Sequence, residues 1–293
     1  MEENLYVANI VLNAVLCFTA LTLNGATIYA LRKTPSVPKP LKALLLSLAV
    51  SDLGVGILGH PLFITYLALE SRLQADLRTS FPTFHKVSYF VTFKFTFASF
   101  FGVLSLSLDR FLAIHLHLRY QELVTYQRVV TAVISVWVLS GLIQLIWLIP
   151  FHIAYVLVAI ILVSCLVVSG VLNSMIYATV RRHAHQIHSL QVQPTVQENA
   201  PNVTNASTLR KSTFMTIHIY VLFLVCYLPF VCVCVLEFTS FYRGLAVLKA
   251  VRQYTFTLVL LNSSLNPLIY CWKLRGVRQT IMNTLLNAIS SQN

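Results

Sequence analysis

Charged side chains are scarce in this chain of 293 residues, where they make up 10% of the total and only nine are acidic. Soluble globular domains carry about 25% charged residues, so the composition argues strongly against a soluble domain. Hydrophobic residues account for 57%, and the mean hydropathy is +0.75. The composition therefore predicts an integral membrane protein.

Cysteine is also scarce, and none of the six cysteines falls in a predicted loop. They lie within or at the edges of apolar stretches, at Cys17, Cys165, Cys226, Cys232, Cys234 and Cys271. Free cysteine packs as a small hydrophobic side chain, and a metal centre would need clustered ligands at suitable spacing. The sequence therefore predicts neither an extracellular disulfide nor a cysteine metal site.

Seven apolar stretches are long enough to cross about 30 Å of hydrocarbon as helices. They cover residues 8–31, 43–69, 84–114, 129–150, 152–180, 212–239 and 246–272. Pro150 is expected to separate the fourth stretch from the fifth, because 129–180 is about twice the length of one span. The predicted fold class is an all-α membrane protein, a seven-transmembrane helix bundle formed by residues 1–272.

Two segments outside the spans have distinct compositions. Residues 183–208 are rich in Gln, Asn, Thr and His and lack apolar periodicity, which predicts a flexible cytosolic loop. Residues 273–293 are expected to form a short amphipathic eighth helix on the membrane surface and a short cytosolic tail. Its apolar stripe contains Val277, Ile281, Leu285 and Ile289.

The basic residues are distributed unequally between the two sides of the predicted bundle. Fourteen of the 21 Lys and Arg residues fall on the side of the C-terminus and six on the other. The positive-inside rule predicts a multi-pass protein of the plasma membrane with an extracellular N-terminus and a cytosolic C-terminus. The net charge of +12 then reflects topology and contact with anionic membrane lipid, and no nucleic-acid partner is expected.

Polar residues interrupt two of the apolar stretches. The run NSSLNPLIY, residues 262–270, places amides, hydroxyls and a proline in the seventh stretch, and Asp52 is a lone carboxylate in the second. Unsatisfied polar groups in hydrocarbon cost several kcal/mol each, so these side chains should face the bundle interior. Asp52 is the natural counterpart of the amides and hydroxyls.

Asp109 and Arg110 lie near the cytosolic end of the third stretch. Such a pair can be a snorkelling membrane anchor. Alternatively, it can be a two-state switch in which Arg110 leaves Asp109 for tyrosines such as Tyr177 and Tyr270. The pair alone does not decide between these two interpretations.

The order of these motifs resembles the rhodopsin-like (class A) G-protein-coupled receptors over nearly the whole chain. The matching features are Asn24, LSLAVSDL with Asp52, Asp109-Arg110-Phe111, Trp137, Phe223 with CYLP ending at Pro229, and NPLIY with Asn266, Pro267 and Tyr270. The segment 109–125 further resembles the melanocortin, cannabinoid and adenosine receptor group. The resemblance implies a receptor that couples ligand binding to a heterotrimeric G protein, and not an enzyme.

The resemblance also implies three sets of functional residues. A possible allosteric sodium ion would be bound by Asp52, Ser99, Asn262, Ser263 and Asn266. The activation switch would comprise Asp109, Arg110, Tyr177, Phe223, Tyr227, Pro229, Asn266, Pro267 and Tyr270. The ligand-binding positions would be Thr92, Phe93, Thr96, Tyr227, Phe230, Val231, Cys234, Arg252 and Phe256.

Departures from the family pattern narrow the function. Leu209, Arg210 and Lys211 stand where the family has an acid that locks the switch, which predicts basal signalling. Thr92 and Cys234 disfavour an amine and adenosine as ligands. Arg252, at the predicted rim of an apolar pocket, suits an acidic lipid or another small anion.

The connection between the fourth and fifth stretches is too short to form a lid, so the ligand pocket should open to water or to lipid. The ligand itself stays an unidentified small molecule or lipid. An alternative is an orphan receptor that signals mainly by basal activity or through a dimer partner. A transporter is disfavoured because the seven stretches show no internal repeat. An intramembrane enzyme is disfavoured because its candidate metal ligands, His183, His185 and His188, fall in the expected flexible loop with no acid near them. His60 and His218 are expected to be isolated core histidines.

Overall fold

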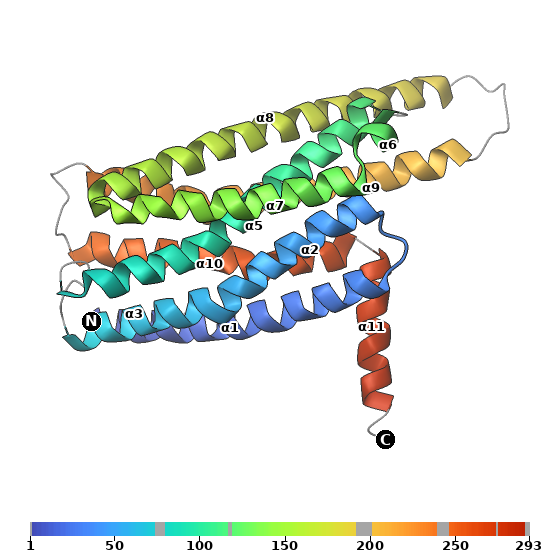
Figure 1. Cartoon of the computed structure of the whole chain (residues 1–293). Coiled ribbons are helices and arrows are strands. Elements are labelled where there is room, and N and C mark those ends of the chain that lie inside the picture. Colours follow the sequence, from blue (N-terminus) through green and yellow to red (C-terminus); the bar gives the residue numbers. More distant parts are fainter. Residues whose placement is uncertain are drawn as a thin grey trace.

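The computed structural model describes residues 2–73, 80–116, 119–191, 201–238, 246–273 and 275–290, and these are helical almost throughout. The described helices form seven rods, residues 2–33, 39–73, 82–116, 126–148, 151–191, 201–238 and 246–273. These rods lie side by side, and a further helix, residues 275–290, projects from one end of the bundle (Figure 1). The elements in chain order are α1 (Glu2–Lys33), α2 (Lys39–Gly54), η1 (Val55–Gly59), α3 (His60–Leu73), α5 (Pro82–Leu116), α6 (Tyr120–Leu123), α7 (Tyr126–Ile143), η3 (Gln144–Leu148), α8 (Phe151–Gln191), α9 (Pro201–Phe238), α10 (Ala246–Lys273) and α11 (Arg275–Ser290).

Within the described residues, six rods are long and apolar enough to cross a membrane. The rod α10 is not among these six, because amides such as Asn262 and Asn266 make it more polar. It nevertheless packs between α1 and α9. The predicted all-α bundle is confirmed.

The bounds of two helices differ from the prediction. The rod α8 continues to Gln191, and α9 begins at Pro201. The expected flexible loop 183–208 is therefore wrong at both ends, while residues 192–200 lie outside the described residues. Each residue added to an existing helix gains one hydrogen bond without a new nucleation step, so helices readily extend past an apolar segment.

A π-helical turn interrupts the second rod. It covers Val55–Gly59 and joins α2 to α3 within one continuous helix. Such turns add a residue to one turn and rotate the helix beyond it. Just before this turn, Gly54 lies so close to the ring of Phe95 on α5 that a Cβ atom there would overlap it. Close packing of the second rod on α5 therefore depends on that glycine.

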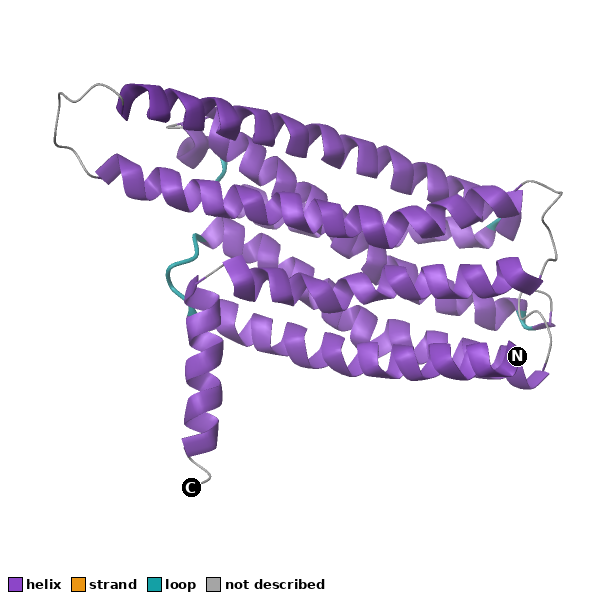
Figure 2. Cartoon of the chain, turned by 180° about the vertical axis from the view of Figure 1, so that it is seen from behind, coloured by secondary structure: helices purple, strands orange, loops and turns teal. Residues whose placement is uncertain are grey.

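The helix α11 projects away from the end of the bundle (Figure 2). It docks on the end of α1, where the hydroxyls of Thr34 and Thr280 are hydrogen-bonded at 3.0 Å. Val277 is fully buried at this contact. The predicted eighth helix is thus present with Val277 on its apolar stripe, and the side chains of Leu285 and Ile289 lie outside the described residues.

Candidate functional site

Three rods meet at one buried carboxylate in the middle of the bundle. Asp52 on α2 has no solvent-exposed surface. The hydroxyl of Ser99 on α5 donates to its Oδ1 at 2.9 Å, and Nδ2 of Asn266 on α10 donates to its Oδ2 at 2.8 Å. The Ser263 side chain also interacts with the carboxylate. The structure therefore brings Asp52 together with the polar run on α10, as the sequence predicts.

Several polar atoms of the same run on α10 have no hydrogen-bond partner in the described part of the structure. They are both side-chain polar atoms of Asn262, Oδ1 of Asn266 and the hydroxyl of Tyr270, all of which are buried. An unsatisfied buried polar group costs about 1–3 kcal/mol, so such groups are usually met by water or an ion. The amide oxygens of Asn262 and Asn266 and the Asp52 carboxylate are the oxygen ligands that hard cations prefer.

The predicted switch pair lies at the opposite end of the bundle from the N-terminus. Nε of Arg110 donates to Oδ2 of Asp109 at 2.9 Å, and its Nη2 donates to the same oxygen. Both residues are buried. The hydroxyl of Tyr120 on α6 donates to Oδ1 of Asp109 at 2.7 Å. Arg110 is therefore held by a carboxylate that is itself anchored from the neighbouring connection.

Tyr120 is the member of this group that sequence reasoning missed. Burial and the charge of Asp109 raise the pKa of the Tyr120 hydroxyl, which therefore stays protonated and keeps donating. Its position in the short basic connection after α5 is a signal that could have identified it. The three side chains form one hydrogen-bonded group, and we call the arrangement in which Asp109 holds Arg110 the closed arrangement.

The other switch residues occupy separate places. Tyr177 on α8 is 50% exposed and forms no hydrogen bond with any described residue, whereas Tyr270 on α10 is fully buried. Phe223 stacks on Tyr227 with ring centroids 5.1 Å apart, and Pro229 lies inside α9. The side chains of Leu209, Arg210 and Lys211 lie outside the described residues.

The sequence matches a family model described as "7 transmembrane receptor (rhodopsin family)" over residues 23–155 and 149–270. These ranges include the polar core, the Asp109–Arg110 pair and the whole of the polar run on α10. The chain belongs to the rhodopsin receptor family.

Two relatives of this receptor are named as receptors of different kinds, a melanocortin receptor and an adenosine receptor. The chain is 25% identical to melanocortin receptor 3 of Homo sapiens over 272 residues, 89% of this chain and 80% of the relative. It is 32% identical to adenosine receptor A2b of Gallus gallus over 138 residues, 46% of this chain and 38% of the relative. The predicted family is confirmed, and the relatives are not enzymes.

The predicted ligand-binding residues of the receptor are packed against one another. Phe93 on α5, Phe230 on α9 and Phe256 on α10 are in mutual ring contact, with centroids 5.4–5.9 Å apart. The remaining space beside Phe256, Tyr89 and Thr92 leaves no room for a water molecule. The expected open pocket is therefore wrong in this arrangement, because aromatic side chains fill the position.

The expected place of Arg252 at the pocket rim is also wrong. Its side chain is 2% exposed and lies inside the bundle. The other predicted positions Thr92, Thr96, Val231 and Cys234 are likewise buried. The helix periodicity placed these residues on the inward faces, but it could not show how deep Arg252 lies.

A carboxylate that sequence reasoning passed over joins three rods near the N-terminal end. Glu70 on α3 is buried and pairs with Nζ of Lys249 on α10 at 3.0 Å. It also accepts hydrogen bonds from Tyr66 and Gln253, and Gln253 in turn contacts the hydroxyl of Tyr6 on α1. We call Tyr6, Tyr66, Glu70, Lys249 and Gln253 the outer clasp. The polar contacts of these residues link α1, α3 and α10.

Below the outer clasp, four buried side chains form a second polar cluster. Nδ2 of Asn13 donates to Oδ1 of Asn9 at 2.9 Å and to the hydroxyl of Thr257 at 3.0 Å, and Nδ1 of His60 lies 3.0 Å from Oδ1 of Asn13. His60 is therefore not an isolated histidine. His218 likewise has an aromatic neighbour, Trp272.

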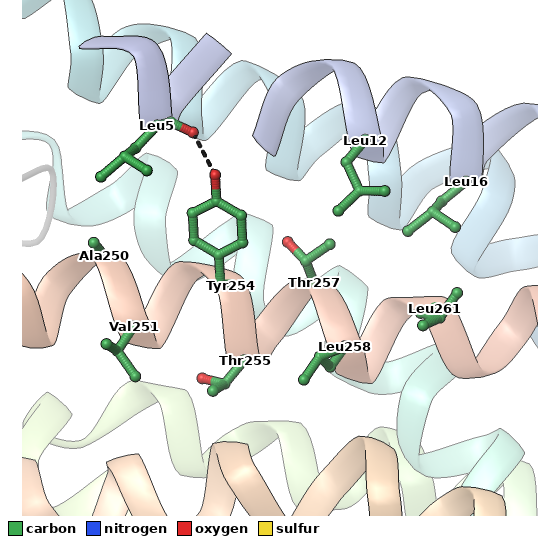
Figure 3. A pocket seen from close by; sticks show the side chains of 10 residues that line it. All are labelled: Leu5, Leu12, Leu16, Ala250, Val251, Tyr254, Thr255, Thr257, Leu258 and Leu261. Atoms are coloured by element: carbon green, nitrogen blue, oxygen red, sulfur yellow. Dashed lines mark hydrogen bonds between the residues drawn. The ribbon is translucent and has the colours of Figure 1, made fainter. Parts of the chain in front are cut away.

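The larger of two apolar cavities described on the bundle lies between α1 and α10, with a volume of about 560 Å³. Figure 3 shows Leu5, Leu12 and Leu16 facing the residues of α10 across it. At one end the hydroxyl of Tyr254 donates to the backbone oxygen of Leu5 at 2.8 Å. Leu5 and Leu12 are more than 40% exposed, so this cavity faces the surroundings of the bundle and not its centre.

Proposed function

We propose that this receptor, in the plasma membrane with its N-terminal end outside, couples a small ligand in the bundle to activation of a heterotrimeric G protein. The observation that carries the proposal is the Asp109–Arg110–Tyr120 group. A buried guanidinium that an anchored carboxylate holds can leave it for other partners, such as tyrosines. Its release can therefore separate two states of the bundle. The fourteen basic residues at that end agree with a cytosolic face.

Basal activity is the direct test, because it needs no identified ligand. The sequence places no acid at residues 209–211 to restrain Arg110 from α9, so cells that express the receptor should show G-protein activation above that of mock-transfected cells. G-protein biosensors of each subtype, read at matched surface expression, measure this. Equal signals in both cell populations for every subtype would contradict the proposal.

The packed aromatic interior supports a second candidate within the same fold. A receptor whose pocket position is filled by its own side chains can signal mainly by basal activity or through a dimer partner. A signal that rises steeply with receptor density, beyond proportionality, would favour a dimer partner over an isolated receptor.

We also propose that the polar core around Asp52 binds a sodium ion. Asp52, Ser99, Ser263, Asn266 and the unsatisfied amide oxygen of Asn262 would hold it. Its charge would neutralise the buried carboxylate and favour the closed arrangement.

Replacing external sodium by N-methylglucamine should therefore raise basal activation by about fivefold, a coupling of ordinary size between two sites. The variant Asp52→Asn should abolish this response. Ser51→Ala is the matched control, because the Ser51 hydroxyl donates to the backbone oxygen of Leu48 in its own helix. A sodium response that survives in Asp52→Asn would rule out this site.

A further inference from the structure

Trp147 is a fully buried side chain that comes from the connection between α7 and α8. It lies in the short helix η3 and is 1% exposed. Its ring centroid is 5.1 Å from that of Tyr89, 5.4 Å from that of Phe93 and 5.5 Å from that of Tyr155. Rings from α5 and α8 therefore surround one indole on several sides.

This indole adjoins the position where the sequence places the ligand. Phe93, one of its three ring neighbours, also contacts Phe230 and Phe256. Tyr89, another neighbour, contacts Phe256 as well. The connection between α7 and α8 is too short to cover the bundle as a lid, and it places a side chain inside the bundle instead.

The polar edge of the indole has a dedicated acceptor. Nε1 of Trp147 donates to Oε1 of Gln144 at 3.2 Å. Gln144 has no exposed surface, and its Nε2 donates to the backbone oxygen of Ser140 at 2.8 Å. Because Nε2 is engaged with the backbone, Oε1 is left to face the indole N–H. The space that the Trp147 indole fills therefore fits a flat bicyclic ring, and Oε1 of Gln144 is its hydrogen-bond acceptor.

We propose that this place is a subsite for one flat bicyclic aromatic group with an N–H donor, which Trp147 occupies as an internal ligand. Trp147 is seated in the same structure in which Asp109 holds Arg110, and the proposal extends to the seated side chain favouring that closed arrangement. A ligand that enters the bundle has to displace it. The signalling part of this inference rests on the proposed function, whereas occupancy of the subsite does not.

Binding is tested with the variant Trp147→Ala in lipid nanodiscs. Removal of the ring leaves an apolar cavity of the kind that binds small aromatic molecules. Indole should raise the melting midpoint of Trp147→Ala by about 3 °C or more and leave the wild type unchanged. Benzofuran, which has the same shape without the N–H, should bind about tenfold more weakly, as expected for one lost hydrogen bond.

The matched control is Trp137→Ala. Trp137 lies on α7, only ten positions before Trp147 along the chain, and its Nε1 is also hydrogen-bonded, to Ser47. That side chain is only partly buried and is not among the rings around Phe93. Indole should leave the midpoint of Trp137→Ala unchanged. Equal shifts in the two variants, or no shift in Trp147→Ala, would overturn the subsite.

Signalling supplies the second readout. Trp147→Ala should raise basal G-protein activation at matched surface expression, and indole should lower it again. Indole-dependent stabilisation without any change in signalling would retain the subsite and reject its link to the closed state. If Trp147→Ala does not reach the surface, it is expressed with indole in the medium. Restored surface expression supports the proposal, and failure to restore it, while Trp147→Phe reaches the surface, overturns it.

Discussion

Replacing Arg110 by alanine is expected to abolish basal G-protein activation. The guanidinium is the group that Asp109, itself anchored by Tyr120, holds in the closed arrangement. Alanine has no group that could move to new partners when the bundle opens. A loss of more than about tenfold is expected, since a buried charged hydrogen bond contributes about 1.5–3 kcal/mol. G-protein biosensors at matched surface expression measure the loss.

A graded series separates this role from that of a membrane anchor. Arg110→Lys keeps the charge but loses the forked hydrogen bonds, so it should retain only part of the activity. Arg32→Ala removes an exposed basic residue at the end of α1 and should leave activation unchanged. Activation that persists undiminished in Arg110→Ala would show that the pair is only an anchor.

Removing the Glu70 carboxylate is expected to destabilise the receptor more than most single substitutions. Glu70→Ala leaves Lys249, whose side chain is only 27% exposed, without its partner, together with the donors of Tyr66 and Gln253. Breaking a buried ion pair costs about 3–5 kcal/mol. The melting midpoint in nanodiscs should fall by about 5–10 °C.

The double substitution tells an ion pair from simple loss of packing. Lys249→Met alone strands Glu70 and should also lower the midpoint, whereas Glu70→Gln with Lys249→Met removes both charges and should recover most of the loss. Glu122→Ala, at an exposed acid on α6, is the control. If the double variant is no more stable than the single variants at Glu70 and Lys249, the charges of the outer clasp do not interact.

The sequence predicts the partners of Asp52 well, because a carboxylate in hydrocarbon has few alternatives to the amides and hydroxyls of other spans. The sequence also predicts the Asp109–Arg110 pair at the end of the third span and Val277 on the apolar stripe of the eighth helix. The role of Glu70 was not predicted, because this residue stands at the end of a predicted span, where a charged side chain can reach water.

Sequence reasoning also did not predict the buried positions of Trp147 and Arg252 or the π turn, and the reason is different. Helix periodicity gives the direction of a side chain but not the depth at which it settles, and a rotation within a helix leaves no mark in an apolar sequence. Whether a predicted pocket is open or filled depends on side-chain volumes from distant segments. In this receptor, Phe93, Trp147 and Phe256 come from three different parts of the chain and fill the same place.

The contacts of the first helix decide where a label for measuring surface expression can be attached. Leu5, Tyr6, Asn9 and Asn13 each form a hydrogen bond with α10. The first turns of α1 are therefore an integral part of the end of the bundle that holds the outer clasp. An epitope fused directly to these turns would strain the contacts that the measurements are meant to report. Labels for surface quantification belong beyond α11, which points away from the bundle (Figure 2), with surface exposure read by membrane-impermeant biotinylation.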